Sequence, residues 1–313
     1  MSEPSSWGPE QYRATVEQRR QQERARNAAR RRMLVRQEQR RRLIIISASG
    51  TVVVVFVLGL VWLGTQPTMS TASLADTVLM DVSSQRPSPG FEAEPVPIGR
   101  PPLGASTEDH ASYRFIERQV HEDGPVAWDP CRPIHYVVNP ATAPKGGDVL
   151  LRKAIAAVSA ATGLQFIDDG ETDESRSFLR ESFQQRAYGD RWAPVLIQWT
   201  DGSDFAAGLE GSIIGRAGGT PVTGLTGGPM VYVSGVVALD GPQMEDLMHS
   251  DDLGPAAARS VIMHELGHLV GLDHVEDPTQ IMYPTTQFGV STFGEGDLTG
   301  LRALSRGQCA PDL

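Results

Sequence analysis

The sequence predicts an α+β domain that follows a single membrane-spanning helix. Three apolar, β-rich runs at residues 133–139, 195–199 and 230–239 read as strands, and a helical pattern over residues 148–161 alternates with them. Residues 43–63 form a run of 21 positions without charge or proline. With 313 residues, the chain has room for one domain of about 200 residues and a sizeable non-globular remainder.

Residues 1–42 predict a basic cytoplasmic tail. They hold 12 Arg and 5 Glu, although the whole chain carries a net charge of −10, so 16 basic and 33 acidic residues remain for the rest. Arg40, Arg41 and Arg42 adjoin the apolar run, and no Lys or Arg follows until Arg86. The positive-inside rule therefore places the tail in the cytoplasm. It lacks an apolar stripe, so we expect a solvated tail rather than a nucleic-acid or anionic-lipid contact, and no nucleic-acid partner.

Residues 43–63 predict a transmembrane helix, because about 20 apolar residues cross a hydrocarbon core. A buried helix of a soluble domain is the first alternative, but the run shows no polar face. A cleavable signal is the second, since Ser73 to Ala75 suit cleavage, yet the run is longer than such signals and far from the N-terminus. We expect an uncleaved single-pass anchor with the following domain outside the cytoplasm.

Residues 64–111 predict an extracytoplasmic linker, because they are rich in Pro, Ser, Gly and Thr without apolar periodicity. Such a stalk would hold the next domain away from the bilayer. Cys131 and Cys309 are the two cysteines of the chain, and an oxidising compartment favours a disulfide between them. In the chain-entropy model that bridge would contribute about 4–5 kcal/mol. Two free thiols remain the alternative.

Residues 112–313 predict the globular domain. After the first strand, Asp148 is the expected cap of a helix that runs through Ala161, and Gly163 is expected to end it. Gly-rich connections fill residues 208–228, and no internal repeat is visible.

The chemistry of the domain is predicted by the stretch from His264 to His274, which reads HELGHLVGLDH. His264 and His268 are four residues apart, so on a helix their imidazoles share one face and can reach one metal ion. A left-handed Gly271 would end the helix and let His274 return as third ligand. Three neutral imidazoles leave a fourth position for water, which is typical of a catalytic rather than a structural zinc site.

Glu265 is the expected general base, because it adjoins the ligands and can take a proton from water at the open position. The opposite stripe of the same helix is apolar and is expected to face the core. Pro255 is expected at the start of this helix. The stripe consists of Ile262, Leu266, Leu269 and Val270.

These residues, followed by Met282-Tyr283-Pro284, closely resemble the metzincin metallopeptidases, and the Met-Tyr-Pro form resembles their matrixin branch. The resemblance covers residues 112–313. It implies a zincin-like fold with a mixed, mostly parallel sheet and an active-site helix, and a turn that carries Met282 beneath the metal. More weakly, residues 217–240 resemble the family's substrate-side edge strand and its neighbour, and residues 296–304 its closing helix.

Two departures from the matrixins affect what the resemblance implies. No cysteine-switch motif precedes the domain in this sequence, since its first cysteine is Cys131. The sequence therefore gives no support for an enzyme kept inactive by a cysteine switch. The histidines of the family's structural zinc site are not recognisable either. Asp168, Asp169 and Asp201 could be assigned to structural calcium only by guesswork, and solvated loop carboxylates are the preferred interpretation.

The resemblance implies hydrolysis of peptide bonds in a protein or peptide substrate, with one catalytic Zn²⁺. A zinc-containing surface binding module without catalysis is an alternative, although the presence of Glu265 argues against it. A third possibility treats the arginine-rich tail as the active part and the outer domain as a sensor. Substrate, cleavage specificity, activation and oligomeric state are not indicated by the sequence.

Overall fold

The structure is a computed structural model that describes residues 86–99, 112–120, 124–176, 180–204, 207–224, 227–250, 254–287 and 289–313. The predicted tail at 1–42, the predicted span at 43–63 and the linker residues 64–85 and 100–111 lie outside these ranges. Within them, none of the helices combines the length and the apolar character needed to cross a bilayer.

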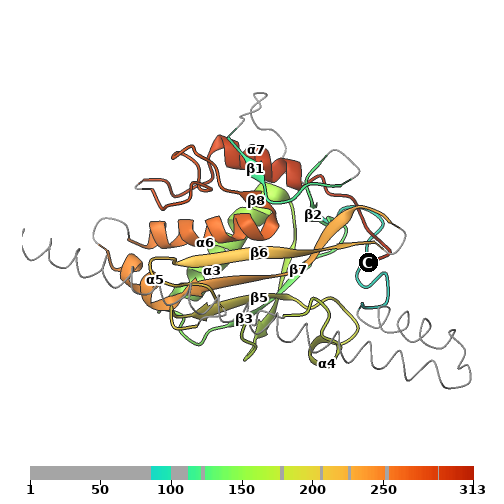
Figure 1. The fold of residues 1–313 in the computed structure, drawn as a ribbon, viewed down its shortest axis with the longest axis horizontal. Coiled ribbons are helices and arrows are strands. Elements are labelled where there is room, and N and C mark those ends of the chain that lie inside the picture. The colour runs from blue at the N-terminus through green and yellow to red at the C-terminus, as the bar shows by residue number, and fades with distance from the viewer. Residues whose placement is uncertain are drawn as a thin grey trace, which may run out of the picture. The chain divides into compact units, whose positions relative to one another are not determined.

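A six-stranded mixed sheet is the centre of the fold (Figure 1). The strand order is β2-β7-β5-β3-β4, and β6 pairs with the other side of β7. All pairs are parallel except β6 with β7, so the predicted mixed, mostly parallel sheet is confirmed. The strands are β2 (Ala127–Trp128), β3 (Ile134–Asn139), β4 (Phe166–Glu171), β5 (Val195–Thr200), β6 (Gly215–Thr223) and β7 (Met230–Asp240).

The buried strands explain why the sheet forms where the sequence predicts it. Every residue of β5 is buried, as expected for a central parallel strand, which reads as a continuous apolar run. Tyr136 of β3 lies opposite Val195, and Leu196 lies opposite Val236 of β7. Because parallel neighbours need a crossover, a long helix connects β3 to β4.

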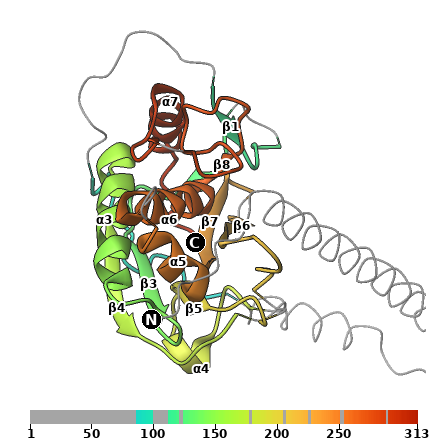
Figure 2. The ribbon, with the colours of Figure 1, turned by 90° about the vertical axis from the view of Figure 1, so that its left-hand side faces the viewer.

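Helices α3 (Gly147–Thr162) and α6 (Gly254–Val270) lie side by side and share one apolar core with the sheet (Figures 1 and 2). Leu150 of α3, Trp199 of β5 and Leu266 of α6 belong to this core, and burial of each large apolar side chain stabilises the fold by about 1.5–3 kcal/mol. The other helices among the described residues are α4 (Gln185–Tyr188), α5 (Gly241–Met248) and α7 (Glu295–Leu304).

The start of α3 differs from the sequence prediction. Its N-cap is Gly146 in a left-handed conformation, and Asp148 lies in the first turn, where it pairs with Arg152 at 2.9 Å. An acidic side chain in the first turn favours the helix through the dipole without capping it, which is why the sequence pattern looked like a cap. The predicted end is confirmed, since Gly163 caps the helix with φ of 75°.

A two-stranded sheet holds the start of the predicted domain against the turn after α6. Strand β1 (Arg114–Phe115) pairs antiparallel with β8 (Leu272–Asp273). The Ile116 amide also donates to the Gly271 carbonyl at 3.0 Å. Residues 114–116 therefore fix the turn that leads from α6 to His274.

Part of the predicted linker is bound to the domain. Residues 86–99, called the strap below, do not run free as a stalk, because their backbone groups find partners on the domain surface. A side chain added at Gly99 would begin 1.7 Å from the Gly163 carbonyl oxygen, so the strap also packs closely on the end of α3. Its hydrogen bonds include Arg86 Nη1 to the Thr223 carbonyl (2.9 Å), Glu94 N to the Cys131 carbonyl (2.8 Å), Ile98 N to the Pro130 carbonyl (3.0 Å) and the Glu92 carboxylate with His135 (2.6 Å).

The C-terminal segment is held beside the first long strand by a disulfide. Cys131 and Cys309 are joined with their Cα atoms 5.4 Å apart, which leaves neither cysteine of the chain free. The buried Asp129 carboxylate supports this junction by accepting the Cys131 amide at 2.8 Å and the Ala310 amide at 3.2 Å. The bridge therefore joins segments 178 residues apart in the sequence.

Candidate active site

Helix α6 positions two of the three predicted histidines. His264 and His268 lie one turn apart, and their ring centroids are 4.7 Å apart. The predicted core stripe is buried on the opposite side, with Ile262, Leu266 and Val270 fully excluded from solvent. Because that stripe packs in the main core, the helix presents both imidazoles in fixed positions.

Gly271 ends α6 and returns the chain toward the two histidines. Its φ is 120°, a conformation that favours glycine, and its amide is shared between the carbonyls of Gly267 and His268. An added Cβ would also lie 3.0 Å from Leu304 Cδ2. The strand β8 follows directly and delivers His274 to the face of α6.

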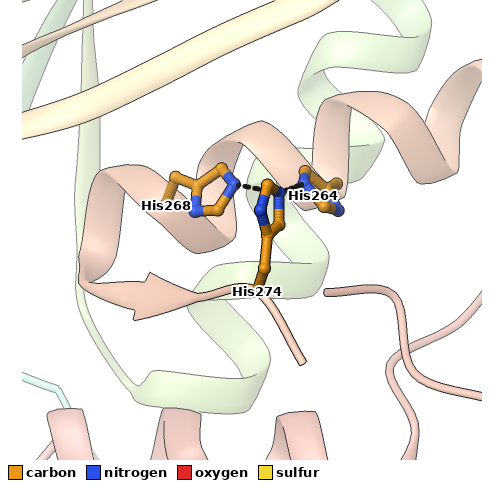
Figure 3. Close-up of side chains that lie close together, drawn as sticks. All are labelled: His264, His268 and His274. Carbon is orange, nitrogen blue, oxygen red and sulfur yellow. Dashed lines mark hydrogen bonds between the residues drawn. The ribbon is translucent and has the colours of Figure 1, made fainter. Parts of the chain in front are cut away.

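The three imidazoles converge through their Nε2 atoms, as Figure 3 shows. His274 Nε2 lies 3.0 Å from His264 Nε2 and 3.1 Å from His268 Nε2. In a tetrahedral site with Zn–N bonds of about 2.0–2.1 Å, ligand nitrogens are about 3.3 Å apart. The spacing of the three nitrogens therefore fits a zinc ion between them.

Backbone carbonyls fix the tautomers of the two helical histidines. Nδ1 of His264 lies 2.7 Å from the Ile281 carbonyl, and Nδ1 of His268 lies 2.8 Å from the Leu272 carbonyl. A carbonyl only accepts, so each Nδ1 carries the hydrogen and each Nε2 presents a lone pair. Two converging lone pairs repel each other unless a cation lies between them. This chemistry of the donor set fits a metal ion.

Burial keeps these histidines neutral, which is the state that binds a metal. The pKa of His264 is lowered to about 3, chiefly by burial and next by His268, while its bond to Ile281 acts in the opposite direction. Burial also lowers the pKa of His268.

Glu265 lies next to His264 with 6% of its surface exposed. Its Oε2 is buried and, among the described residues, has no hydrogen-bond partner. Burial raises the pKa of this carboxyl to about 8, and Arg216 opposes the shift. A buried carboxyl with an unused oxygen is suited to exchanging a proton with a bound molecule.

An open cleft contains the three histidines and Glu265. Its lining is mostly uncharged and comes from the start of β6, from α6 and from the segment after Met282. Ile213, Ile214, Val261 and Tyr283 contribute apolar or aromatic surface. A cleft of this kind next to a candidate metal centre can accept an extended chain with apolar side chains.

Residues 230–304 match the sequence family described as matrixin, a stretch that includes β7, α6 and all three histidines. Over 118 residues the chain is 33% identical to macrophage metalloelastase of Oryctolagus cuniculus. The domain is matrixin-like. The aligned stretch is 37% of this chain and 23% of that protein, so the chain spans about a quarter of the relative's length.

Met282 of the matrixin-like domain lies directly against α6. It is 1% exposed, and a Cβ added at Gly267 would lie 2.5 Å from its sulfur. The Met282 carbonyl accepts the Val275 amide at 3.1 Å, which ties the turn to the residue after His274. Met282 thus packs on α6 beside Gly267, one residue before His268, and its position beneath a bound metal stays a prediction.

Asp297 of α7 is a site residue that the sequence did not reveal. Its carboxylate is 1% exposed and accepts the amides of Ile281 (2.6 Å), Met282 (3.3 Å) and Gly294 (3.0 Å). Because the Ile281 carbonyl holds His264, Asp297 supports the histidine through one peptide unit. The available sequence signal was an acidic residue in the first turn of a predicted helix, which is common without any such role.

The aspartates considered for calcium do not gather in the matrixin-like domain. Asp169 binds His135 and Arg191, Asp168 accepts the Gly170 amide, and Asp201 accepts the Ser203 amide. Across the part of the chain that the structure describes, the one other cluster of potential ligands is Asp129 with the two bridged cysteines. These aspartates therefore have local structural partners.

Proposed function

We propose that this chain is a zinc-dependent endopeptidase in which His264, His268 and His274 hold the metal. The observation that carries the proposal is the convergence of three Nε2 atoms beside a buried carboxyl, with the tautomers of two of the histidines fixed by backbone carbonyls. The match of residues 230–304 to the matrixins supports the reaction class. Bound zinc would polarise the scissile carbonyl and lower the pKa of a water molecule toward about 7.

Glu265 is the proposed general base. Its carboxylate accepts the proton that the attacking water loses, and its protonated form then gives a proton to the amide nitrogen as the C–N bond breaks. A pKa raised by burial suits both steps, because the carboxyl can hold and release a proton near neutral pH. Its free Oε2 supports this assignment.

The proposed substrate is an extended segment of a protein or peptide. β6 pairs with β7 on one side, and no described strand pairs with its other side. An extended peptide can add to such an edge through main-chain hydrogen bonds. The start of β6 lines the cleft, so the added strand would pass the histidines.

Glu265→Gln tests the division of roles. The variant should bind about one zinc per chain with unchanged affinity, because Glu265 is not a ligand, while peptide hydrolysis falls on the order of 10²–10⁴-fold. Zinc content by atomic emission and cleavage of a fluorogenic peptide measure the two properties separately. Loss of the metal in this variant would show that the role assignment is wrong.

We also propose that residues 43–63 anchor the protein as a single-pass membrane protein with residues 1–42 in the cytoplasm and the peptidase domain outside. The uncharged run and the adjoining arginines support this topology. The disulfide supports an oxidising compartment for the domain. Protease added to intact cells should digest the His264 domain and spare an N-terminal tag. The reverse pattern would contradict the proposed topology.

A further inference from the structure

The first residue of β6 lies directly against the candidate general base. Gly215 pairs with Leu239 of β7, and α6 passes over this end of the strand. A Cβ built on Gly215 would lie 2.6 Å from both Cγ and Oε1 of Glu265 and 2.7 Å from its Cδ. These distances are shorter than contacts between real side chains, so a side chain at position 215 and the present Glu265 conformation exclude each other.

Glycine is required at position 215 because there is no room for a side chain, and not because of its backbone conformation. Its φ lies outside the left-handed region, in contrast to Gly271, so an L-residue can adopt the same backbone. Three residues further along the same strand, a Cβ added at Gly218 would meet nothing within 4 Å. The atoms that an alanine at 215 would meet first all belong to the Glu265 side chain.

We infer that Gly215 is a positioning residue: the absence of a side chain there provides the space in which the Glu265 carboxyl is held beside the histidine cluster. This inference rests on the proposed role of Glu265. Among the described residues, Oε2 of Glu265 has no hydrogen-bond partner, so no hydrogen bond to this oxygen fixes the carboxyl. A glutamate side chain can adopt another rotamer, so we expect the fold to accommodate a methyl group at position 215 by moving the Glu265 carboxyl. That movement would displace the proposed base from the histidines and lower the rate of hydrolysis.

Gly215→Ala in the full-length protein, purified in mild detergent, tests the inference. A displacement of the base by about 1 Å can lower kcat/KM on the order of 10²-fold, measured on a fluorogenic peptide. Zinc affinity, measured by chelator competition, and the midpoint of thermal unfolding should stay as in the wild type. Gly228→Ala is the matched control, because its added Cβ meets nothing within 4 Å and it does not line the cleft. The inference would be overturned if Gly215→Ala kept the wild-type kcat/KM, or if its KM rose while kcat stayed unchanged.

Double variants show whether Gly215 acts through Glu265. If it does, Gly215→Ala causes no further loss of activity in a Glu265→Gln background, and multiplicative losses would contradict the inference. If Gly215→Ala instead lowers the unfolding midpoint, Glu265→Ala should restore it, because the collision is then removed. Failure of that restoration also overturns the inference. Normal hydrolysis by Glu265→Gln would refute the proposed role of Glu265, and a zinc-loaded wild-type protein that hydrolyses no peptide would refute the proposed function; both results are distinguishable from a failure of the inference about Gly215.

Discussion

At the scale of single residues, each side chain of the site depends on a second group that holds it. The carbonyls of Ile281 and Leu272 fix the tautomers of His264 and His268, respectively. The Asp297 carboxylate accepts the Ile281 amide and so holds that carbonyl in place. Such partners typically contribute 10–100-fold to metal affinity, because they orient the ligands before the metal arrives. The groups that support the candidate metal site therefore extend from α6 through the turn at Met282 to α7.

Asp297→Ala should weaken both the fold and the metal centre. The substitution leaves the amides of Ile281, Met282 and Gly294 without their carboxylate acceptor, which should lower the free energy of unfolding by about 1–3 kcal/mol or more. Zinc affinity should fall about 10–100-fold. Urea unfolding and chelator competition measure the two effects.

Glu295→Ala is the matched control, because Glu295 is an exposed acidic residue in the same first turn of α7. It should leave the free energy of unfolding and the zinc affinity close to those of the wild type. An Asp297→Ala variant that loses stability but keeps wild-type zinc affinity would show that Asp297 does not support His264.

At the scale of elements, the sequence predicts best what is encoded locally. Helix α6, its buried stripe and the glycine that ends it can be predicted from residue spacing within one segment. Strands β5 and β7 can be predicted from their apolar composition. Asp297 and Gly215 escaped prediction because their partners lie 15–16 and 50 residues away in the sequence. Their roles depend on packing between elements that are distant in the sequence, so a local sequence pattern does not predict them.

The strap escaped prediction for a different reason. Its composition of Pro, Gly and Ser shows no apolar periodicity, which is typical of a linker. Its contacts depend instead on backbone amides that donate to carbonyls of Pro130 and Cys131. Such hydrogen bonds can be made by almost any sequence, so the amino-acid pattern does not indicate them.

Gly99→Ala should loosen the strap. The added methyl group would overlap the Gly163 carbonyl, so the end of the strap must move, and overpacking of this kind costs about 1–3 kcal/mol. Hydrogen exchange at the amides of Glu94 and Ile98 should become faster. Gly218→Ala, which adds a methyl group to open space, should leave their exchange unchanged. Equal exchange in the two variants would indicate that the strap does not depend on its contact with α3.

At the scale of the whole molecule, the described residues contain a matrixin-like domain with the strap bound to it and a disulfide that joins Cys131 to Cys309 near the C-terminus. In the sequence, the strap lies between the domain and residues 43–63, which we propose as a membrane anchor. A peptidase tethered in this way would act on substrates that reach its cleft outside the cytoplasm. The central claim, however, concerns the chemistry of that cleft and is independent of the anchor.

The most direct test of that claim is cleavage of an unbiased peptide library by the full-length protein, before and after removal of metal with a chelator. We predict internal cleavage that disappears with the chelator and returns on addition of about one equivalent of zinc, because the three imidazoles gather at a single candidate metal site. The Glu265→Gln protein, loaded with zinc, should cleave on the order of 10²–10⁴-fold more slowly than the wild type. Cleavage that persists without metal, or a zinc-loaded wild-type protein that cleaves no peptide, would contradict the account.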